Sequence, residues 1–152
     1  MAEDARRAEF VESLGGSLAQ MGFPRMPARV FALLLAASED TLTARELAER
    51  LGVSAAAISG AVRYLEQFRM ITRTRTAGDR LDRFGVGGNI WEHAIQAEAA
   101  SFDALLRLFD RALADIDFGG AKDRVAETRD FLAFYQAEIP DLIRRWRESR
   151  GR

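Results

Sequence analysis

Cysteine is absent from the 152 residues, and histidine occurs once, as His93. Without cysteine the chain has no disulfide, no thiol nucleophile and no zinc–thiolate site. A single histidine excludes a histidine-rich metal site within one chain, although carboxylate sites stay open. No glycine-rich phosphate loop is present either. We therefore predict that the protein is not an enzyme, with no catalytic residue, metal or cofactor.

Long apolar segments are also lacking. The longest apolar run covers residues 30–37, which is far shorter than the roughly 20 residues that a membrane-spanning helix needs. The first residues contain no apolar stretch of the kind found in an export signal. Hydrophobic residues make up 48% and charged residues 30%, which is typical of globular proteins. We expect a cytoplasmic protein that does not contact a membrane.

Positive charge is concentrated in one segment, although the whole chain has a net charge of −1. Residues 54–86 carry six arginines against three acids, a local excess of three positive charges, and the remainder of the chain is acidic. A local basic segment of this kind is an electrostatic signature of nucleic-acid binding.

Apolar periodicity predicts six helices, at about residues 3–21, 25–37, 44–51, 55–69, 90–116 and 125–146. Thr43 with Glu46 forms a capping-box pattern, Gly52 suits a left-handed helix end, and Ser54 and Asn89 are expected to cap the helices that follow them. Pro140 is expected to kink the last helix or divide it near Glu138. Residues 38–43 are predicted to be a connector.

The informative segment is the pair of short helices at 44–51 and 55–69. Two helices that cross steeply through a tight turn need a small residue, here Ala48, where they nearly touch. Val53, Ile58, Val62 and Leu65 would bury the inner face of the second helix. Its outward face would then consist of small residues and one arginine, which suits insertion into a DNA major groove; these residues are Ser54, Ala55, Ala56, Ser59, Gly60 and Arg63.

A basic β-hairpin is predicted directly after these helices. Residues 71–76 alternate and are rich in β-branched types, residues 77–79 give a turn signal, and residues 81–86 can return as a second strand. Arg73 and Arg75 are two residues apart and therefore share one strand face, while Arg80 and Arg83 follow the turn. A basic hairpin beside a recognition helix is typical of a wing that meets the minor groove or flanking phosphates.

This order of elements resembles the MarR superfamily of bacterial regulators, and more closely its GbsR-like branch. The resemblance covers nearly the whole chain and rests on residues 21–29, 47–71, 78–84 and 131–146. It implies a mainly α fold with a small β-hairpin wing: a winged helix-turn-helix domain at 24–88, between an N-terminal dimerisation helix at 1–23 and a C-terminal helical dimerisation region at 89–152. The sequence departs from the family in the wing, where an aspartate-x-arginine brace is common, because Asp79-Arg80 and Asp82-Arg83 are adjacent pairs.

The resemblance also implies function. We expect a homodimeric repressor that reads a pseudo-palindromic operator in double-stranded DNA and is released by a small-molecule effector. DNA contacts would fall on Thr43, Ser54, Ala55, Ala56, Ser59, Gly60, Arg63, Arg73, Arg75, Arg80 and Arg83. The dimer interface would include Phe10, Leu14, Leu18, Phe131, Phe134, Tyr135, Leu142 and Trp146. An effector would contact Phe23, Trp91 and Phe102.

Two other interpretations stay open. A helix-turn-helix also occurs as a protein-binding module, and in that case the chain would be a helical dimer that never contacts DNA. The second is a ligand-binding or enzymatic helical protein, in which case a pocket with convergent polar groups is expected. The wing arginines favour DNA binding, because a protein-binding module does not need them.

Overall fold

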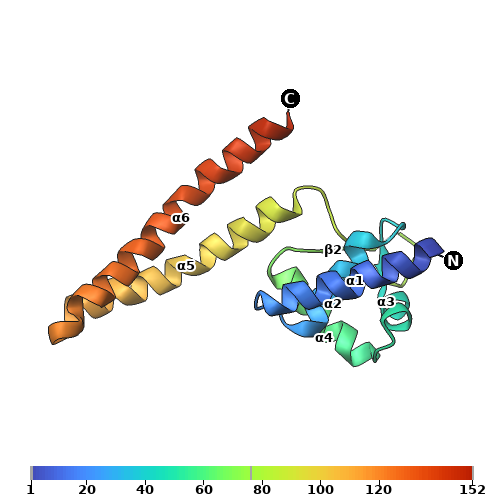
Figure 1. Cartoon of the computed structure of the whole chain (residues 1–152), viewed down its shortest axis with the longest axis horizontal. Helices are drawn as coiled ribbons and strands as arrows, with labels where there is room; N and C mark the ends of the chain where they lie inside the picture. Colours follow the sequence, from blue (N-terminus) through green and yellow to red (C-terminus); the bar gives the residue numbers. More distant parts are fainter. Residues whose placement is uncertain (1, 76, 152) are drawn as a thin grey trace. The chain divides into compact units, whose positions relative to one another are not determined.

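A computed structural model describes residues 2–75 and 77–151, and Figure 1 shows the chain. Residues up to Trp91 form one compact unit, here called the N-terminal lobe, and residues from Glu92 onward form a second, the C-terminal helix pair. In order, the elements are α1 (Ala2–Gln20), α2 (Arg25–Ala36), β1 (Leu42–Thr43), α3 (Ala44–Leu51), α4 (Ala55–Gln67), β2 (Thr72–Thr74), β3 (Arg83–Gly85), α5 (Ile90–Asp115), the 3-10 helix η1 (Gly119–Ala121) and α6 (Lys122–Arg150).

The N-terminal lobe is organised around α2. This helix packs against α1, α3 and α4, which explains why its apolar residues occur on nearly every side. The largest fully buried side chains come from α2, β1, α3 and α4; they are Val30, Phe31, Leu42, Leu47, Ile58 and Leu65. Each such side chain contributes roughly 1.5–3 kcal/mol through the apolar surface it removes from water.

Local signals fix the ends of α3 and the start of α4, as predicted. The Thr43 hydroxyl accepts a hydrogen bond from the Glu46 amide, and the Glu46 carboxylate accepts one from the Thr43 amide at 2.7 Å. Gly52 ends α3 with φ 64°, in the left-handed region that favours glycine. Ser54 caps α4 by accepting a hydrogen bond from the Ala57 amide at 3.2 Å.

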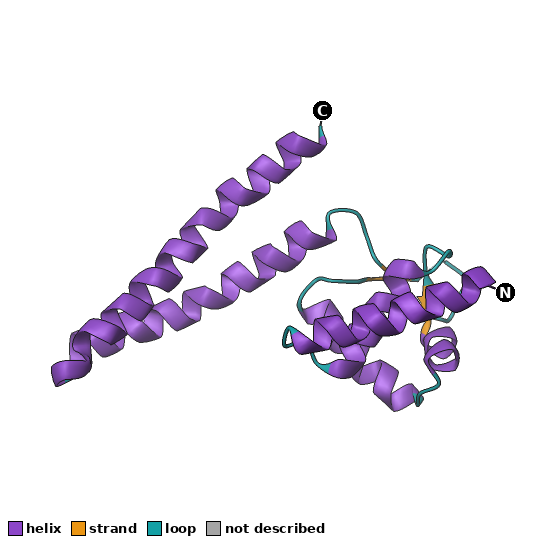
Figure 2. Cartoon of the chain, in the orientation of Figure 1, coloured by secondary structure: helices purple, strands orange, loops and turns teal. Residues whose placement is uncertain are grey.

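The wing is part of a three-stranded antiparallel sheet with the strand order β1-β3-β2. The predicted β-hairpin is confirmed as β2 and β3, both shorter than expected, and Thr76 of the predicted strand lies outside the described residues (Figure 2). The prediction of a simple connector at 38–43 was wrong, because Leu42 and Thr43 pair with Phe84 and Arg83. Gly85 is required here: a Cβ would lie 2.5 Å from the Asp40 carbonyl oxygen.

The C-terminal helix pair consists of α5 and α6, which run antiparallel and are joined through η1 (Figure 1). Arg129 donates to Asp110 at 2.8 Å near the η1 end, and Arg147 donates to Glu92 at 2.7 Å near the other end. Of the two outcomes predicted for Pro140, a kink in the last helix or its division near Glu138, the division was wrong. The helix is continuous through this proline, and buried Ile139 and Ile143 lie on either side of it. Asn89 has φ 59° rather than the extended backbone of a capping residue, so the prediction that Asn89 caps α5 was wrong.

The two units differ in how much apolar surface they cover. Many large apolar side chains of the C-terminal helix pair are exposed; these include Leu105, Leu108, Phe131, Phe134, Tyr135, Leu142 and Trp146. Within the described residues, no helix combines the length and the apolar character needed to cross a bilayer.

Candidate nucleic-acid interface

Helix α4 presents a continuous face of small side chains. Ser54, Ala55, Ala56, Ser59, Gly60 and Arg63 are all exposed, whereas Ile58, Val62 and Leu65 of the same helix are buried against the lobe. The sequence therefore predicted the inward and outward faces of α4 correctly. A protruding helix with short side chains can enter the major groove closely enough for its backbone and hydroxyls to reach base edges and phosphates.

A tight turn holds α4 at its angle to α3. The Val53 amide donates to the Ala48 carbonyl at 3.0 Å, which closes the turn through Gly52. Arg63 is the last residue of the exposed face along the helix, and its Nε donates to the Ser59 carbonyl at 3.3 Å. The guanidinium nitrogens that this contact leaves free can reach a guanine edge or a phosphate.

Thr43 was predicted as a DNA contact, but its side chain is committed inside the lobe. The residue is 7% exposed, and its hydroxyl both accepts from the Glu46 amide and donates to the Glu46 carboxylate at 2.9 Å. The Thr43 amide, and to a smaller extent the Thr43 hydroxyl, donate to the Glu46 carboxylate and keep the pKa of Glu46 below its usual value. Thr43 therefore shapes the start of α3, and its hydroxyl has no free donor to offer to DNA.

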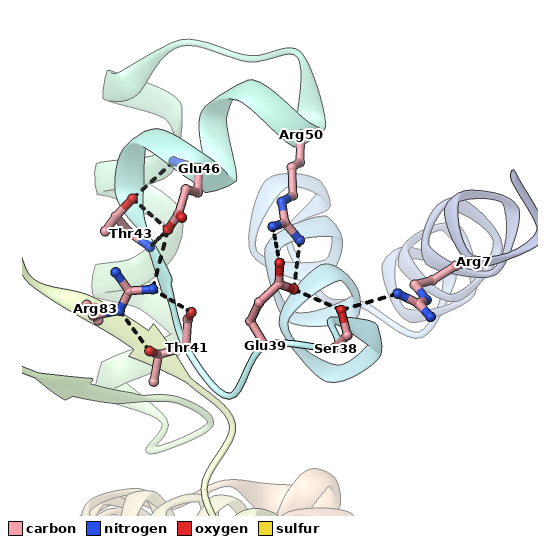
Figure 3. Close-up of polar contacts among 8 residues, drawn as sticks. All are labelled: Arg7, Ser38, Glu39, Thr41, Thr43, Glu46, Arg50 and Arg83. Carbon is pink, nitrogen blue, oxygen red and sulfur yellow. Dashed lines mark hydrogen bonds and ion pairs between the residues drawn. The ribbon is translucent and has the colours of Figure 1, made fainter. Parts of the chain in front are cut away.

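Arg83 is held in a similar way at the base of the wing. Its guanidinium donates to the Thr41 hydroxyl at 2.9 Å and to the Thr41 carbonyl at 3.0 Å, and it lies 3.7 Å from the Glu46 carboxylate (Figure 3). These contacts fasten β3 to the segment before α3. The predicted DNA contact of Arg83 thus competes with a structural role that the sequence did not indicate.

The same figure shows a second group of polar contacts, which sequence reasoning missed. Arg50 of α3 forms a two-pronged ion pair with Glu39, and Arg7 of α1 approaches Ser38 at 3.5 Å (Figure 3). The hydrogen bond from Arg50 lowers the pKa of Glu39 to about 2. The loop between α2 and β1 is thereby tied to α3, with α1 beside it.

The remaining wing arginines fall into two classes. Arg73 and Arg75 both pair with Asp82, and Arg73 also pairs with Glu66 of α4. Asp82 therefore pairs with arginines on the opposite arm of the wing, at positions that the aspartate-x-arginine spacing did not indicate. Within the described part of the chain, Arg80 is exposed and has no hydrogen-bond or ion-pair partner. It is the wing cation most available to a phosphate.

The residues predicted to contact an effector lie in different parts of the fold. Trp91 packs edge-on against Phe31, with ring centroids 5.7 Å apart, and Phe23 is half-buried in the turn before α2. Phe102, on α5, packs against Tyr135 of α6 at 5.6 Å. The effector contact of these three residues stays a prediction.

The predicted dimer residues divide by exposure. Phe10, Phe131, Phe134, Tyr135, Leu142 and Trp146 are exposed, and Leu14 is half-buried. Leu18 is only 8% exposed because it belongs to the core of the lobe, so it has little surface left for a partner. Among the described residues, no group of three or more His, Asp or Glu side chains could hold a metal ion.

Comparison with known proteins agrees with this arrangement. A sequence model of the MarR family matches residues 21–80, and one described as "MmpR5-like MarR family transcriptional regulator" matches residues 89–149. The HTH-type transcriptional regulator MmpR5 of Mycobacterium tuberculosis is 31% identical over 146 residues, which cover 94% of this chain and 88% of that protein. The chain belongs to the MarR family of transcription regulators.

A solved structure described as that of a transcriptional regulator is similar to nearly the whole chain. It has 30% sequence identity and a TM-score of 0.84, and the match covers 94% of this chain and 99% of that one. The mainly helical fold with a small sheet, predicted from sequence, is thus confirmed.

Proposed function

We propose that the protein is a sequence-specific DNA-binding repressor in which α4 is the recognition helix. The observation that carries this proposal is the division of α4 into a buried apolar face and an exposed face of six small or basic residues, 54–56, 59, 60 and 63. No other described part of the lobe covers that exposed face. Placed in a major groove, its serines would bond phosphates or base edges, its alanine methyls would meet thymine methyls, and Arg63 would contact guanine.

The wing would contribute contacts to the sugar–phosphate backbone. Arg80 is free for this role among the described residues, and Arg75 is exposed and pairs with Asp82. Such contacts add affinity that falls with salt, because each neutralised phosphate releases counterions. Base reading by α4 and phosphate binding by the wing would together give both selectivity and strength.

The exposed apolar face of the C-terminal helix pair favours a homodimer. Large exposed apolar patches on a globular protein mark interaction surfaces, and the patch here includes Phe131, Phe134, Leu142 and Trp146. A two-fold dimer would present two copies of α4 to a pseudo-palindromic operator, with half-sites about one helical turn, roughly 34 Å, apart.

Release by a small molecule would follow from this geometry. An effector that prefers a dimer with altered spacing between the two α4 helices would break the match to both half-sites. Phe23, Trp91 and Phe102 are the residues we propose for its contact. We also retain the interpretation that the chain is related to the GbsR-like branch, from the segments at 21–29 and 131–146.

Fluorescence anisotropy with the DNA that flanks the chain's own gene, against a scrambled duplex of equal length, tests the proposal. Between about 50 and 200 mM salt we expect selective binding whose affinity falls steeply. Arg63→Ala should weaken selective binding by roughly 1–3 kcal/mol, whereas Arg124→Ala, the same charge change on α6, should not.

Two other outcomes of this binding experiment would contradict the proposal. Salt-sensitive binding without selectivity would contradict the recognition role of α4. If neither duplex bound at any salt concentration, the chain would instead be the helical protein-interaction module that the fold also allows.

A further inference from the structure

Four charged residues form a closed group between the recognition helix and the wing. They are Glu66 in the last turn of α4, Arg73 in β2, Arg75 directly after β2, and Asp82 directly before β3. We call this group the wing clasp. Its ion pairs link the recognition helix to both arms of the wing, and the sequence alone gave no role to Glu66.

Arg73 is the centre of the wing clasp. Its Nε and Nη2 donate to the two oxygens of Glu66, both at 2.8 Å, and its Nη1 donates to Asp82 at 3.0 Å. The guanidinium also lies over the ring of Phe84, 5.1 Å from the ring centre. All three nitrogens are therefore engaged, and the flat face of the group is packed. A side chain held in this way is poorly placed to bond a phosphate.

Arg75 completes the group from the other side of Asp82. Its Nε donates to the second Asp82 oxygen at 2.8 Å, and Nη2 lies 2.6 Å from the same atom. This bond with Arg75 keeps the pKa of Asp82 below its usual value, so the carboxylate stays charged at neutral pH. One acid thus joins the two strands of the wing, while the other joins the wing to α4.

The charges of the wing clasp argue against a purely electrostatic role. Two arginines and two acids cancel formally, and acids near a DNA surface repel phosphates. If the wing served only to attract DNA, it would bind more strongly without Glu66 and Asp82. The two acids therefore have another role. Their ion pairs indicate that they fix the wing relative to the recognition helix.

We infer that Glu66, Asp82 and Arg73 are positioning residues that set the placement of the wing against α4, and that Arg73 does not itself contact DNA. This inference rests on the proposed function. It assigns the phosphate contacts of the wing to Arg80, with Arg75 as a second donor that can leave Asp82. Preorganisation of this kind raises affinity because the loop is ordered before DNA arrives.

Glu66→Gln gives the sharpest test, because a net-charge account and a positioning account predict opposite changes in DNA affinity. Removing a negative charge should strengthen DNA binding if only net charge matters. If the wing clasp positions the wing, the variant should bind the own-gene duplex about threefold to tenfold more weakly, with little change for the scrambled duplex. Glu49→Gln is the matched control, since Glu49 is an exposed acid of the same lobe that pairs with Arg45 on its own helix. It should bind as well as the wild type or slightly better.

The salt dependence of DNA affinity distinguishes a positioning role for Arg73 from a phosphate contact by Arg80. Loss of a phosphate contact lowers the slope of log affinity against log salt by about 0.9. We expect Arg80→Gln to lower the slope by about this amount. Arg73→Gln should weaken selective binding while leaving the slope unchanged. A lowered slope for Arg73→Gln would overturn its assignment as a positioning residue.

Hydrogen exchange in the free protein tests the wing clasp without DNA. Backbone amides at residues 72–75 and 81–85 should exchange faster in Glu66→Gln than in the wild type, and not in Glu49→Gln. If Glu66→Gln binds the own-gene duplex as well as the wild type and exchange is unchanged, the inference fails while the proposed function stands. If the wild type binds no DNA, the proposed function and the DNA role of the wing clasp both fail, whatever the exchange data show.

Discussion

The N-terminal lobe and the C-terminal helix pair differ in where their apolar side chains lie: the lobe buries them in a core, whereas the helix pair leaves many of them exposed. In the lobe, a central helix is surrounded by three others and a small sheet, and six large side chains are fully buried. In the helix pair, Ile139 and Ile143 are buried, while Phe131, Phe134 and Trp146 remain exposed. Two antiparallel helices have only one mutual contact face, so the rest of their apolar surface stays exposed unless a partner covers it, as the proposed homodimer would.

This difference separates two tasks. A lobe with its own core can hold α4 and the wing in a defined arrangement, which sequence reading requires. A helix pair that is incomplete alone can gain its stability from association, which makes it suited to join two lobes. Stability of the lobe should therefore be independent of protein concentration, and that of the helix pair should not.

The largest expected effect is on the lobe core. Leu47→Ala removes a fully buried side chain and should lower the free energy of unfolding of the lobe by about 2–5 kcal/mol, at any protein concentration. Leu142→Ala is the matched change at an exposed position of the helix pair. Its cost, measured by urea unfolding followed by circular dichroism, should disappear at low protein concentration. If the two variants lost equal free energy of unfolding at every protein concentration, the proposed difference between the lobe and the helix pair would be contradicted.

Disruption of the exposed face of α6 should come next. Replacing both Phe131 and Phe134 by serine places hydroxyls on the proposed interface, and sedimentation should then show half the mass of the wild type. Affinity for the own-gene duplex should fall about 100-fold, because two half-sites are no longer bound by one linked molecule. An unchanged mass for this double variant would place the dimer contact elsewhere, and a monomeric wild type would contradict the proposal.

A smaller effect is expected where the wing approaches the loop before β1. Gly85→Ala would place a methyl group 2.5 Å from the Asp40 carbonyl oxygen, so backbone must move, at a cost of about 1–3 kcal/mol. Gly60→Ala is the control, because nothing lies within 4 Å of a Cβ there and alanine favours a helix. Thermal unfolding should show a lower transition temperature for the first variant and an equal or higher one for the second.

The smallest effect concerns pH. Arg50 lowers the pKa of Glu39 from its ordinary value of 4.5 to about 2 in the folded lobe. A lowered pKa means that this ion pair stabilises the fold above pH 4.5 and that its contribution is lost as the pH falls from 4.5 toward 2. Glu39→Gln should therefore be less stable than the wild type at pH 7, and the difference should shrink across this range. A difference that stays constant with pH would show that the ion pair contributes nothing.

Sequence patterns predicted those features that depend on neighbouring residues. The capping box at Thr43, the left-handed Gly52 and the two faces of α4 follow from spacings of a few residues, and the structure has each of them. Strand β1 could not be predicted in this way, because two residues form a strand only when a distant partner, β3, lies beside them.

The roles of the charged residues in the candidate site could not be predicted from local sequence either. Composition located a basic segment, but it treated the four wing arginines as equivalent. Their roles depend on polar groups brought near by folding: Glu66 and Asp82 for Arg73, Thr41 and Glu46 for Arg83, and none in the described residues for Arg80. An arginine count therefore indicates nucleic-acid binding without identifying which arginines are free to bind.

Selection of bound sequences from a randomised DNA pool tests the central claim most directly, because the pool samples every operator without choosing one in advance. If a dimer presents two α4 helices to DNA, the full-length protein should enrich an inverted repeat whose half-site centres are about 10–10.5 base pairs apart, and Arg63→Ala should relax the preference at defined positions in each half. Enrichment of a single unrepeated site, or no enrichment at all, would contradict the account.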